Sequence, residues 1–212
     1  MAATALVLGV LASGRGSNLQ AILDAIDAGR CPARVAVVVS DRGDAPALAR
    51  ARATGGGAVH VDPHAYGDRA AFDRAIADVL TDHGVELVCL AGYMRLLSLG
   101  FVARFRGRIL NVHPALLPAF PGLHSQRQAL EYGVKVTGAT VHFVDEGMDT
   151  GPIVFQAPVP VHDDDTEETL AARILREEHR LYPEAIRLYA EGRLVVAGRR
   201  VSIRSERELS SP

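Results

Sequence analysis

Short apolar runs rich in β-branched residues alternate with segments of helical periodicity in the first half of the chain, and this alternation restricts the fold more than any other feature. The strand-length runs occupy residues 5–11, 35–40, 59–61, 85–90 and 109–113, and the helical patterns occupy 18–28, 45–53, 69–82 and 99–105. Gly29, Gly55 and Gly84 follow three of these patterns, where a glycine commonly ends a helix. The alternation predicts an α/β fold with a doubly wound, mostly parallel, Rossmann-like sheet that carries helices on both faces.

The second half of the chain has a different spacing. The apolar runs 136–144 and 153–161 lie close together and predict an antiparallel pair, followed by a long helix at 167–191 and a strand at 193–203. A polar tail at 204–212 is expected to be loose. The 212 residues suit a single domain over 1–203, with two halves that divide near residue 108.

Charge and cysteine content exclude several classes of protein. A formal net charge of -2 gives no electrostatic reason to expect nucleic acid or an anionic membrane as a partner. Cys31 and Cys89 lack metal-ligand spacing and do not form a disulfide framework. No lysine or arginine precedes the apolar start TALVLGVLA, so we interpret it as a first strand rather than a signal peptide and expect a cytoplasmic protein.

A glycine-rich turn, Ser13-Gly-Arg-Gly-Ser-Asn18, joins the first strand to the first helix. Glycines let the backbone approach a ligand, and a helix N-terminus attracts phosphate, so the turn favours phosphate binding. Ser17 and Gln20 also match a capping box, which would need no ligand. A dinucleotide-binding turn remains an alternative, with Asp41 as the ribose acid, although the usual third glycine is replaced by Leu19.

The strand at 109–113 ends in two polar residues. Asn111 and His113 are two apart, so they share one face of the strand, and Pro114 stops regular pairing directly after them. Ligands of open α/β sheets bind beyond the carboxyl ends of the strands. An amide and an imidazole can both donate to an oxygen that gains negative charge, and the imidazole can also carry protons. This pair therefore favours direct acyl transfer through a tetrahedral intermediate, since no nucleophile elbow or neighbouring cysteine indicates a covalent acyl-enzyme.

The acidic loop VDEGMDTGPI lies between the two later strands. Asp145 and Glu146 are interpreted as solvated carboxylates, whereas Asp149 precedes Thr-Gly-Pro and is expected in a constrained turn. A fixed carboxylate beside His113 would raise the pKa of the imidazole and keep it protonated.

Glu178 lies on the apolar face of the last helix, four residues after Ile174 and three before Leu181. The carboxylate must reach the solvent rim, find a partner or bind a ligand such as an amine, and the sequence leaves these alternatives open.

Four motifs, SGRGSNLQAI, LAGYMRLLS, NVHPALLPAFPGLHS and GATVHFVDEGMDTGPI, together closely resemble the folate-dependent phosphoribosylglycinamide formyltransferase family. The resemblance extends from residue 5 to about residue 195. It implies a formyltransferase fold with a phosphate-binding N-terminal half and a folate-binding, catalytic C-terminal half. It also implies transfer of a formyl group from 10-formyltetrahydrofolate to the amine of 5-phosphoribosylglycinamide in purine biosynthesis, with no metal. The oligomeric state is left open, and a homodimer is one alternative.

The resemblance assigns roles residue by residue. The family's catalytic residues fall on Asn111, His113 and Asp149, with the first two on the oxyanion and Asp149 holding His113 protonated. The substrate phosphate site falls on Gly16, Ser17 and Asn18, and the substrate-binding glutamate on Glu178. The folate-binding residues implied by the family are Arg69, Met94, Arg95, Leu96, Leu97, Asn111, Asp145, Glu146, Gly147, Met148 and Asp149. Many relatives carry a second histidine where Gln126 stands, which puts that histidine's auxiliary role in doubt here.

Three alternatives compete with this interpretation. Methionyl-tRNA formyltransferase shares the motif around His113, but it carries an additional C-terminal domain that the length of this chain leads us not to expect. Formyltetrahydrofolate hydrolase usually has an extra N-terminal regulatory domain, for which the start of the first strand leaves no room. A dinucleotide-binding regulatory module would explain the glycine-rich turn but not Asn111, His113 or Asp149.

Overall fold

The computed structural model describes residues 5–205 and 208. The chain divides into two compact units, one ending at Asn111 and the other beginning at Val112. Each unit is described below by itself. The expected organisation as a single domain, with halves that divide near residue 108, stays a prediction.

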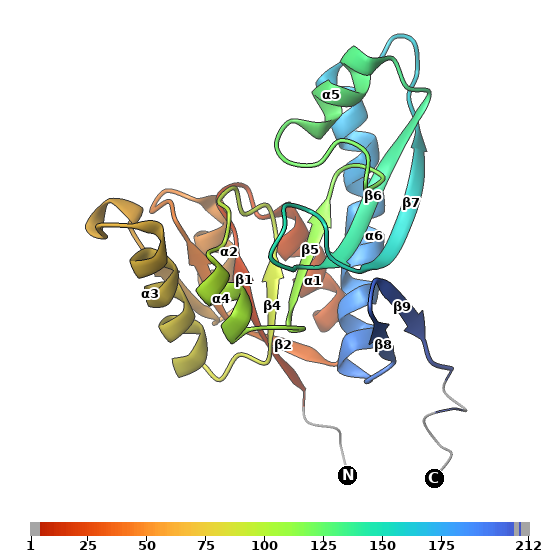
Figure 1. Ribbon diagram of the computed structural model, residues 1–212. Coiled ribbons are helices and arrows are strands. Elements are labelled where there is room, and N and C mark those ends of the chain that lie inside the picture. Colours follow the sequence, from red (N-terminus) through yellow and green to blue (C-terminus); the bar gives the residue numbers. More distant parts are fainter. Residues whose placement is uncertain (1–4, 206–207, 209–212) are drawn as a thin grey trace. The chain divides into compact units, whose positions relative to one another are not determined.

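The first unit contains a parallel sheet with strand order β3-β2-β1-β4-β5. Its strands are β1 (Leu6–Leu11), β2 (Ala33–Ser40), β3 (Gly57–His60), β4 (Leu87–Leu90) and β5 (Ile109–His113), of which β5 runs on across the unit boundary. Its helices are α1 (Ser17–Asp27), α2 (Pro46–Ala53), α3 (Arg69–Asp82) and α4 (Leu99–Arg104), with a 3-10 turn, η1, at Pro63–Ala65. Figure 1 shows α3 and α4 on one face of this sheet and α1 and α2 on the other. The predicted doubly wound sheet is confirmed.

The bounds of these elements follow from local chemistry. Strands β1 and β4 are buried along almost their whole length, as expected for a sheet covered on both faces. Gly29, Gly55 and Gly84 each adopt a positive φ directly after a helix, which confirms the predicted helix ends. The Asp68 carboxylate accepts the Ala71 N–H and starts α3 at the predicted residue. The short turn η1 was not predicted.

The second unit contains the antiparallel pair β6 (Val136–Phe143) and β7 (Ile153–Pro160), which confirms the predicted pairing. Helix α6 (Glu167–Ala190) packs along both strands (Figure 1). The prediction of a single strand at 193–203 is wrong. Gly198 adopts a positive φ and folds this segment into a hairpin of β8 (Leu194–Ala197) and β9 (Arg200–Ile203), which pairs with β7 at Ile153. Helix α5 (Ser125–Tyr132) was not predicted.

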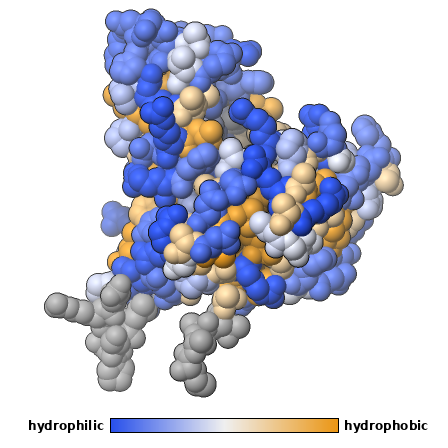
Figure 2. All heavy atoms as spheres, turned by 180° about the vertical axis from the view of Figure 1, so that it is seen from behind, coloured by the Kyte–Doolittle hydropathy of each residue, from blue (hydrophilic) through white to orange (hydrophobic). Residues whose placement is uncertain are grey.

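Most of the tail predicted to be loose lies outside the described residues. Within the described part, the Glu208 carboxylate accepts hydrogen bonds from the Ser205 N–H and hydroxyl. None of the described helices combines the length and apolarity needed to cross a bilayer. Hydrophilic side chains cover most of the face seen in Figure 2, and hydrophobic side chains lie in small groups between them.

Helix α6 begins at a buried carboxylate. Asp165 accepts two hydrogen bonds from the Arg173 guanidinium, at 2.7 and 2.8 Å, one from the His162 N–H at 2.7 Å and one from the Thr169 hydroxyl at 2.8 Å. These donors, the Arg173 guanidinium foremost, hold the pKa of Asp165 well below its ordinary value. The side chain joins the loop after β7 to the first two turns of α6.

Replacing Asp165 with alanine should lower the midpoint of thermal unfolding by several degrees, because the His162 N–H loses its acceptor and the Arg173 guanidinium keeps only the Pro160 carbonyl. Asp163→Ala is the matched control, since Asp163 is exposed and its ion pair with Lys135 is solvated. Circular dichroism melts of the two variants provide the measurement. Equal midpoints would contradict a structural role for Asp165.

Candidate active site

Strand β5 ends at His113, as predicted, and it delivers two polar side chains to its carboxyl end. Leu110 and Val112 are buried, Asn111 is half-buried, and His113 is 4% exposed. Asn111 lies opposite Leu90 in the parallel pairing of β4 and β5. The strand therefore fixes the backbone of both polar residues before Pro114 ends it.

The His113 imidazole is fixed by groups of the second unit. Its Nε2 lies 2.8 Å from the Phe120 carbonyl oxygen, so Nε2 carries a proton and donates to that oxygen. Its Nδ1 lies 3.5 Å from Oδ2 of Asp149. Because Nε2–H is already committed, Nδ1 can donate to Asp149 only when the ring is protonated. The structure thus brings together two residues whose proximity the sequence spacing could not establish.

Burial decides the charge of His113 in this structure. Burial lowers the pKa of the imidazole, while the Asp149 carboxylate and the Phe120 carbonyl raise it and His142 lowers it further. The net pKa lies below the ordinary value of 6.5, which is opposite to the expected direction. The effect of the carboxylate has the expected sign, but the loss of water around the ring outweighs it.

Asp149 is held as a carboxylate. Its burial favours the neutral acid. A hydrogen bond with the His142 ring, the Gly122 N–H at 2.7 Å and the electrostatic effect of His113 and His142 outweigh burial and lower the pKa of Asp149. Asp149 adopts a left-handed φ of 53°. A Cβ on Gly151 would lie 1.8 Å from the Phe143 carbonyl oxygen, so the turn needs glycine there. The predicted constrained turn is confirmed.

His142 is a site residue that sequence reasoning missed. It lies near the end of β6, is 1% exposed, and its Nδ1 lies 2.8 Å from the Phe143 carbonyl oxygen. Its Nε2 faces Oδ1 of Asp149 at 3.7 Å. A signal was present, since His142 is an ionisable side chain in an apolar strand that leads directly into the acidic loop.

The rest of the acidic loop differs partly from expectation. Asp145 is not a freely solvated carboxylate, because Oδ1 accepts the Gly147 N–H at 3.1 Å and the Thr150 hydroxyl at 2.6 Å. Glu146 and Met148 are exposed. Asp145 therefore closes the loop on itself, and this closure holds the segment that leads to Asp149.

The glycine-rich turn of the first unit is shaped by backbone contacts. Gly16 is the N-cap of α1 with a left-handed φ of 71°, and among the described residues no side chain caps this helix. A Cβ at Gly16 would lie 2.9 Å from the Ala47 Cβ, so only glycine fits. The capping box of Ser17 and Gln20, the alternative that would need no ligand, is not formed, because Gly16 is the N-cap and the Gln20 side chain bonds Asp24 and Arg50. Phosphate binding by Gly16, Ser17 and Asn18 stays a prediction.

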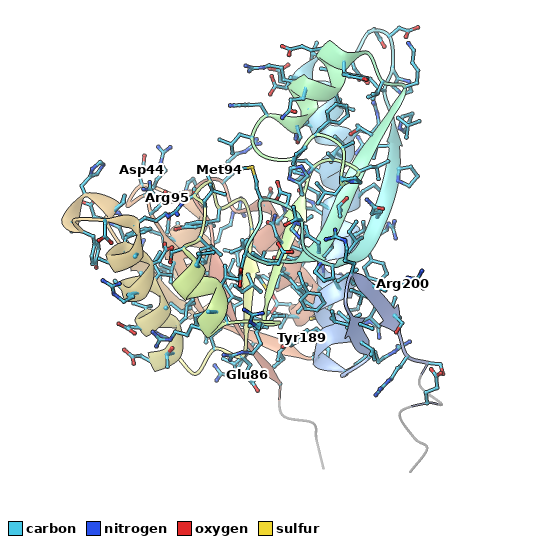
Figure 3. All side chains as sticks on the ribbon, viewed as in Figure 1. Asp44, Glu86, Met94, Arg95, Tyr189 and Arg200 are labelled. Atoms are coloured by element: carbon cyan, nitrogen blue, oxygen red, sulfur yellow. The ribbon has the colours of Figure 1, made fainter. Side chains whose placement is uncertain are left out.

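Other predicted folate-binding residues of the first unit lie at the carboxyl end of its sheet. Residues 94–97 follow β4, and Met94 and Leu96 are 60% and 52% exposed. Figure 3 shows Met94 and Arg95 at the same end of this unit as Asp44, whereas Glu86 lies at the opposite end of β4. Arg69 is the first residue of α3. Asp41, the acid that a dinucleotide would need, is paired with Arg95 at 3.9 Å.

Glu178 lies on α6 among buried apolar residues and is 7% exposed. Its carboxylate therefore does not extend to the solvent rim. The remaining alternatives are a polar group of this chain and a ligand. Gln126 lies in the first turn of α5, and its side-chain oxygen is 3.5 Å from the Ser125 hydroxyl. In the described structure, His113, Asp149 and His142 form one cluster of the second unit, and Asn111 is joined to it through β5.

Comparisons with known proteins agree with the chemistry of this cluster. A model of the formyl transferase family matches residues 7–186. The phosphoribosylglycinamide formyltransferase of Escherichia coli (strain K12) is 45% identical over 185 residues, which is 87% of this chain and 87% of that protein. The trifunctional purine biosynthetic protein adenosine-3 of Gallus gallus is 45% identical over 187 residues, but the match spans only 19% of its length.

Solved structures share the fold. Glycinamide ribonucleotide transformylase 1 from Symbiobacterium toebii is 62% identical with a TM-score of 0.94, and the match covers 95% of each chain. A formyltetrahydrofolate deformylase from Pseudomonas syringae pv. tomato str. DC3000 is 25% identical with a TM-score of 0.88, over 96% of this chain and 67% of that one. The fold alone therefore does not separate transfer from hydrolysis.

Protein stability should fall as the pH is lowered from about 7 to 5, because the pKa of His113 is lower in the folded than in the unfolded state. A group with a lowered folded pKa stabilises fully above its unfolded pKa, here about 6.5, and loses this contribution as the pH falls through its folded pKa. Asp149 follows the same rule below about pH 4.

Denaturant unfolding at a series of pH values tests this expectation. His113→Asn should show a shallower loss of unfolding free energy between pH 7 and 5 than the wild type, whereas His64→Asn, which alters an exposed histidine, should not. Parallel curves for the wild type and His113→Asn would show that burial does not control the ionisation of this ring.

Proposed function

We propose, for a chain that belongs to the formyl transferase family, that it transfers the formyl group of 10-formyltetrahydrofolate to the amine of 5-phosphoribosylglycinamide in purine biosynthesis. The observation that carries the proposal is the end of β5, where Asn111 and His113 emerge and the Asp149 carboxylate lies 3.5 Å from the His113 ring. The high identity to phosphoribosylglycinamide formyltransferases supports the choice of amine.

The chemistry needs an oxyanion stabiliser and a route for protons. The substrate amine attacks the formyl carbon, and the carbonyl oxygen gains negative charge as the tetrahedral intermediate forms. The Asn111 amide donates to this oxygen. The His113 Nε2–H donates to it as well, in place of the Phe120 carbonyl that it meets in the structure. Negative charge on the oxyanion adds to that of Asp149, which favours protonation of His113 and offsets the effect of its burial. Asp149 then accepts from the protonated ring and orders the water that carries the proton from the amine.

The remaining residues bind the two substrates. Gly16, Ser17 and Asn18 supply the left-handed turn and helix start that suit a phosphate, and buried Glu178 accepts hydrogen bonds from the amine substrate. The folate is bound by Arg69, by residues 94–97 largely through backbone groups, and by the loop 145–149. In this proposal the enzyme acts on two small molecules in the cytoplasm without a metal, and a homodimer is the assembly to be examined.

Hydrolysis of 10-formyltetrahydrofolate is the competing activity, and the likeness to a deformylase is the specific observation in its favour. The two activities separate in one assay. A transferase releases tetrahydrofolate only when the ribonucleotide amine is present, whereas a hydrolase releases it with water alone.

Purified protein should convert 10-formyltetrahydrofolate only in the presence of 5-phosphoribosylglycinamide, followed by folate absorbance. His113→Ala should lower kcat by roughly 10²–10⁴ while leaving folate binding intact, because the ring acts on the reacting atoms. His64→Ala, which alters an exposed histidine, is the control. Unchanged absorbance with both substrates saturating refutes the proposed function, and a near-normal kcat of His113→Ala refutes the role of the ring.

Glu178→Gln should raise KM for 5-phosphoribosylglycinamide about tenfold with a smaller change in KM for 10-formyltetrahydrofolate, since it removes a charged acceptor for the amine substrate. Glu177→Gln is the matched control, because Glu177 pairs with Arg180 on the same helix at 2.7 Å. Steady-state kinetics with each substrate varied in turn give both constants. A KM equal to that of Glu177→Gln would remove Glu178 from the substrate site.

A further inference from the structure

The segment 93–98 of the first unit has no regular secondary structure, yet side chains from three other elements fasten it. The first contact is at Ser13, directly after β1. The Ser13 hydroxyl oxygen accepts the Met94 N–H at 3.0 Å, and the Ser13 N–H donates to the Gly92 carbonyl at 3.0 Å. Ser13 is 6% exposed, so these bonds are shielded from water. The start of the segment is therefore tied to the end of the first strand.

The end of the segment is fastened by a buried carboxylate. Asp73 of α3 is 1% exposed and accepts the Ser98 N–H. The Ser98 hydroxyl in turn accepts the Phe101 N–H at 3.4 Å and caps α4. A charged acceptor makes a stronger bond to a backbone N–H than a neutral one. This contact fixes the point at which the segment enters the next helix.

Between these two points, Arg95 is held by its side chain. One guanidinium nitrogen lies 3.9 Å from Oδ2 of Asp41, and the guanidinium carbon lies 5.3 Å from the centre of the Phe72 ring. The Asp41 side chain is 9% exposed, and within residues 5–205 and 208 its Oδ1 is buried without a hydrogen-bond donor. Arg95 is thus the cation that balances a nearly buried acid.

Helix α3 connects these contacts to the proposed folate site. Arg69 is its first residue, Phe72 follows three residues later and Asp73 four residues later, so all three side chains lie within neighbouring turns. Burial raises the pKa of the Tyr93 hydroxyl, and the charges of Asp41 and Asp73 raise it further, so both carboxylates act on the same segment. The helix that presents Arg69 also supports the segment that follows β4.

We propose that Asp41 and Arg95 form a positioning pair for the folate site, in which the Arg95 guanidinium holds residues 94–97 in place and does not itself contact 10-formyltetrahydrofolate. The proposal rests on the proposed function. The contacts with Asp41 and Phe72 orient the Arg95 side chain, 42% of which is exposed, and leave the backbone N–H and C=O groups of the segment to face the pteridine ring. Removing Arg95 alone leaves a nearly buried carboxylate without its cation, and the segment must move to admit water to it.

A charge-removal series tests this proposal. Arg95→Met should raise KM for 10-formyltetrahydrofolate about tenfold, because the coupling energy between two contacting residues changes an affinity by about this factor. Both kcat and KM for 5-phosphoribosylglycinamide should stay within about twofold of wild type. The double variant Asp41→Asn/Arg95→Met removes both charges. Its KM for 10-formyltetrahydrofolate should be lower than that of Arg95→Met by at least about threefold. If the guanidinium contacts folate, the double variant stays as impaired as Arg95→Met, and the proposal is overturned.

Two further measurements keep the outcomes separate. Arg42→Met is the matched control, because Arg42 follows the same strand and pairs with Asp44 at the surface, and it should leave every constant unchanged. Calorimetric titration of each folded variant with tetrahydrofolate should reproduce the pattern in KM. Should Arg95→Met not fold, Asp41→Asn still decides. It should raise KM for 10-formyltetrahydrofolate several-fold, because the Arg95 guanidinium loses its anion, and a KM equal to that of wild type refutes the pair. Wild-type protein that neither binds tetrahydrofolate nor transfers formyl refutes the proposed function itself, whereas active wild type with unaltered variants refutes only the pair.

Discussion

The Asp149 carboxylate lies between two buried imidazoles of the second unit, and the surrounding backbone is shaped to keep it there. Oδ2 accepts the Gly122 N–H and faces His113, while Oδ1 faces His142. Each ring donates its other N–H to a backbone carbonyl, so each can take up a second proton only by donating to this one carboxylate. The one carboxylate is therefore shared by both rings, and it raises the pKa of His113 while the His113 ring lowers the pKa of Asp149.

This coupling has a consequence for acyl transfer. A His113 ring that stayed protonated throughout would be a stable buried charge, and burial opposes that charge. A lowered pKa of His113 is compatible with catalysis if negative charge arrives with the reaction. In the proposed mechanism, an oxyanion forming beside His113 supplies this charge, and Asp149 lies at a distance from which it can accept from the ring. The pKa of His113 then rises as the tetrahedral intermediate forms, which is the step that needs the protonated ring.

Sequence reasoning predicted what local periodicity determines and missed what distant contacts determine. The parallel strands, the start of α3 and the end of β5 follow from apolar patterns and from Pro114. The capping box at Ser17 failed because α2 approaches the turn and Arg50 engages Gln20, a contact between residues 30 apart. The net pKa shift of His113 depends on burial, and His142 joins the site only through the fold. Neither is encoded in the spacing of residues within a motif.

Carboxylates with little exposed surface hold the loops that follow three strands, each by accepting a backbone N–H. Asp73 holds the loop after β4, Asp149 the loop after β5, and Asp165 the loop after β7. Asp165 is neutralised by Arg173, whose guanidinium stays charged at any physiological pH, so that loop is fixed permanently. Asp149 instead faces the imidazole of His113, which can gain or lose its charge. An aspartate that holds a loop by accepting a backbone N–H therefore forms a contact that depends on protonation when its basic partner is histidine instead of arginine.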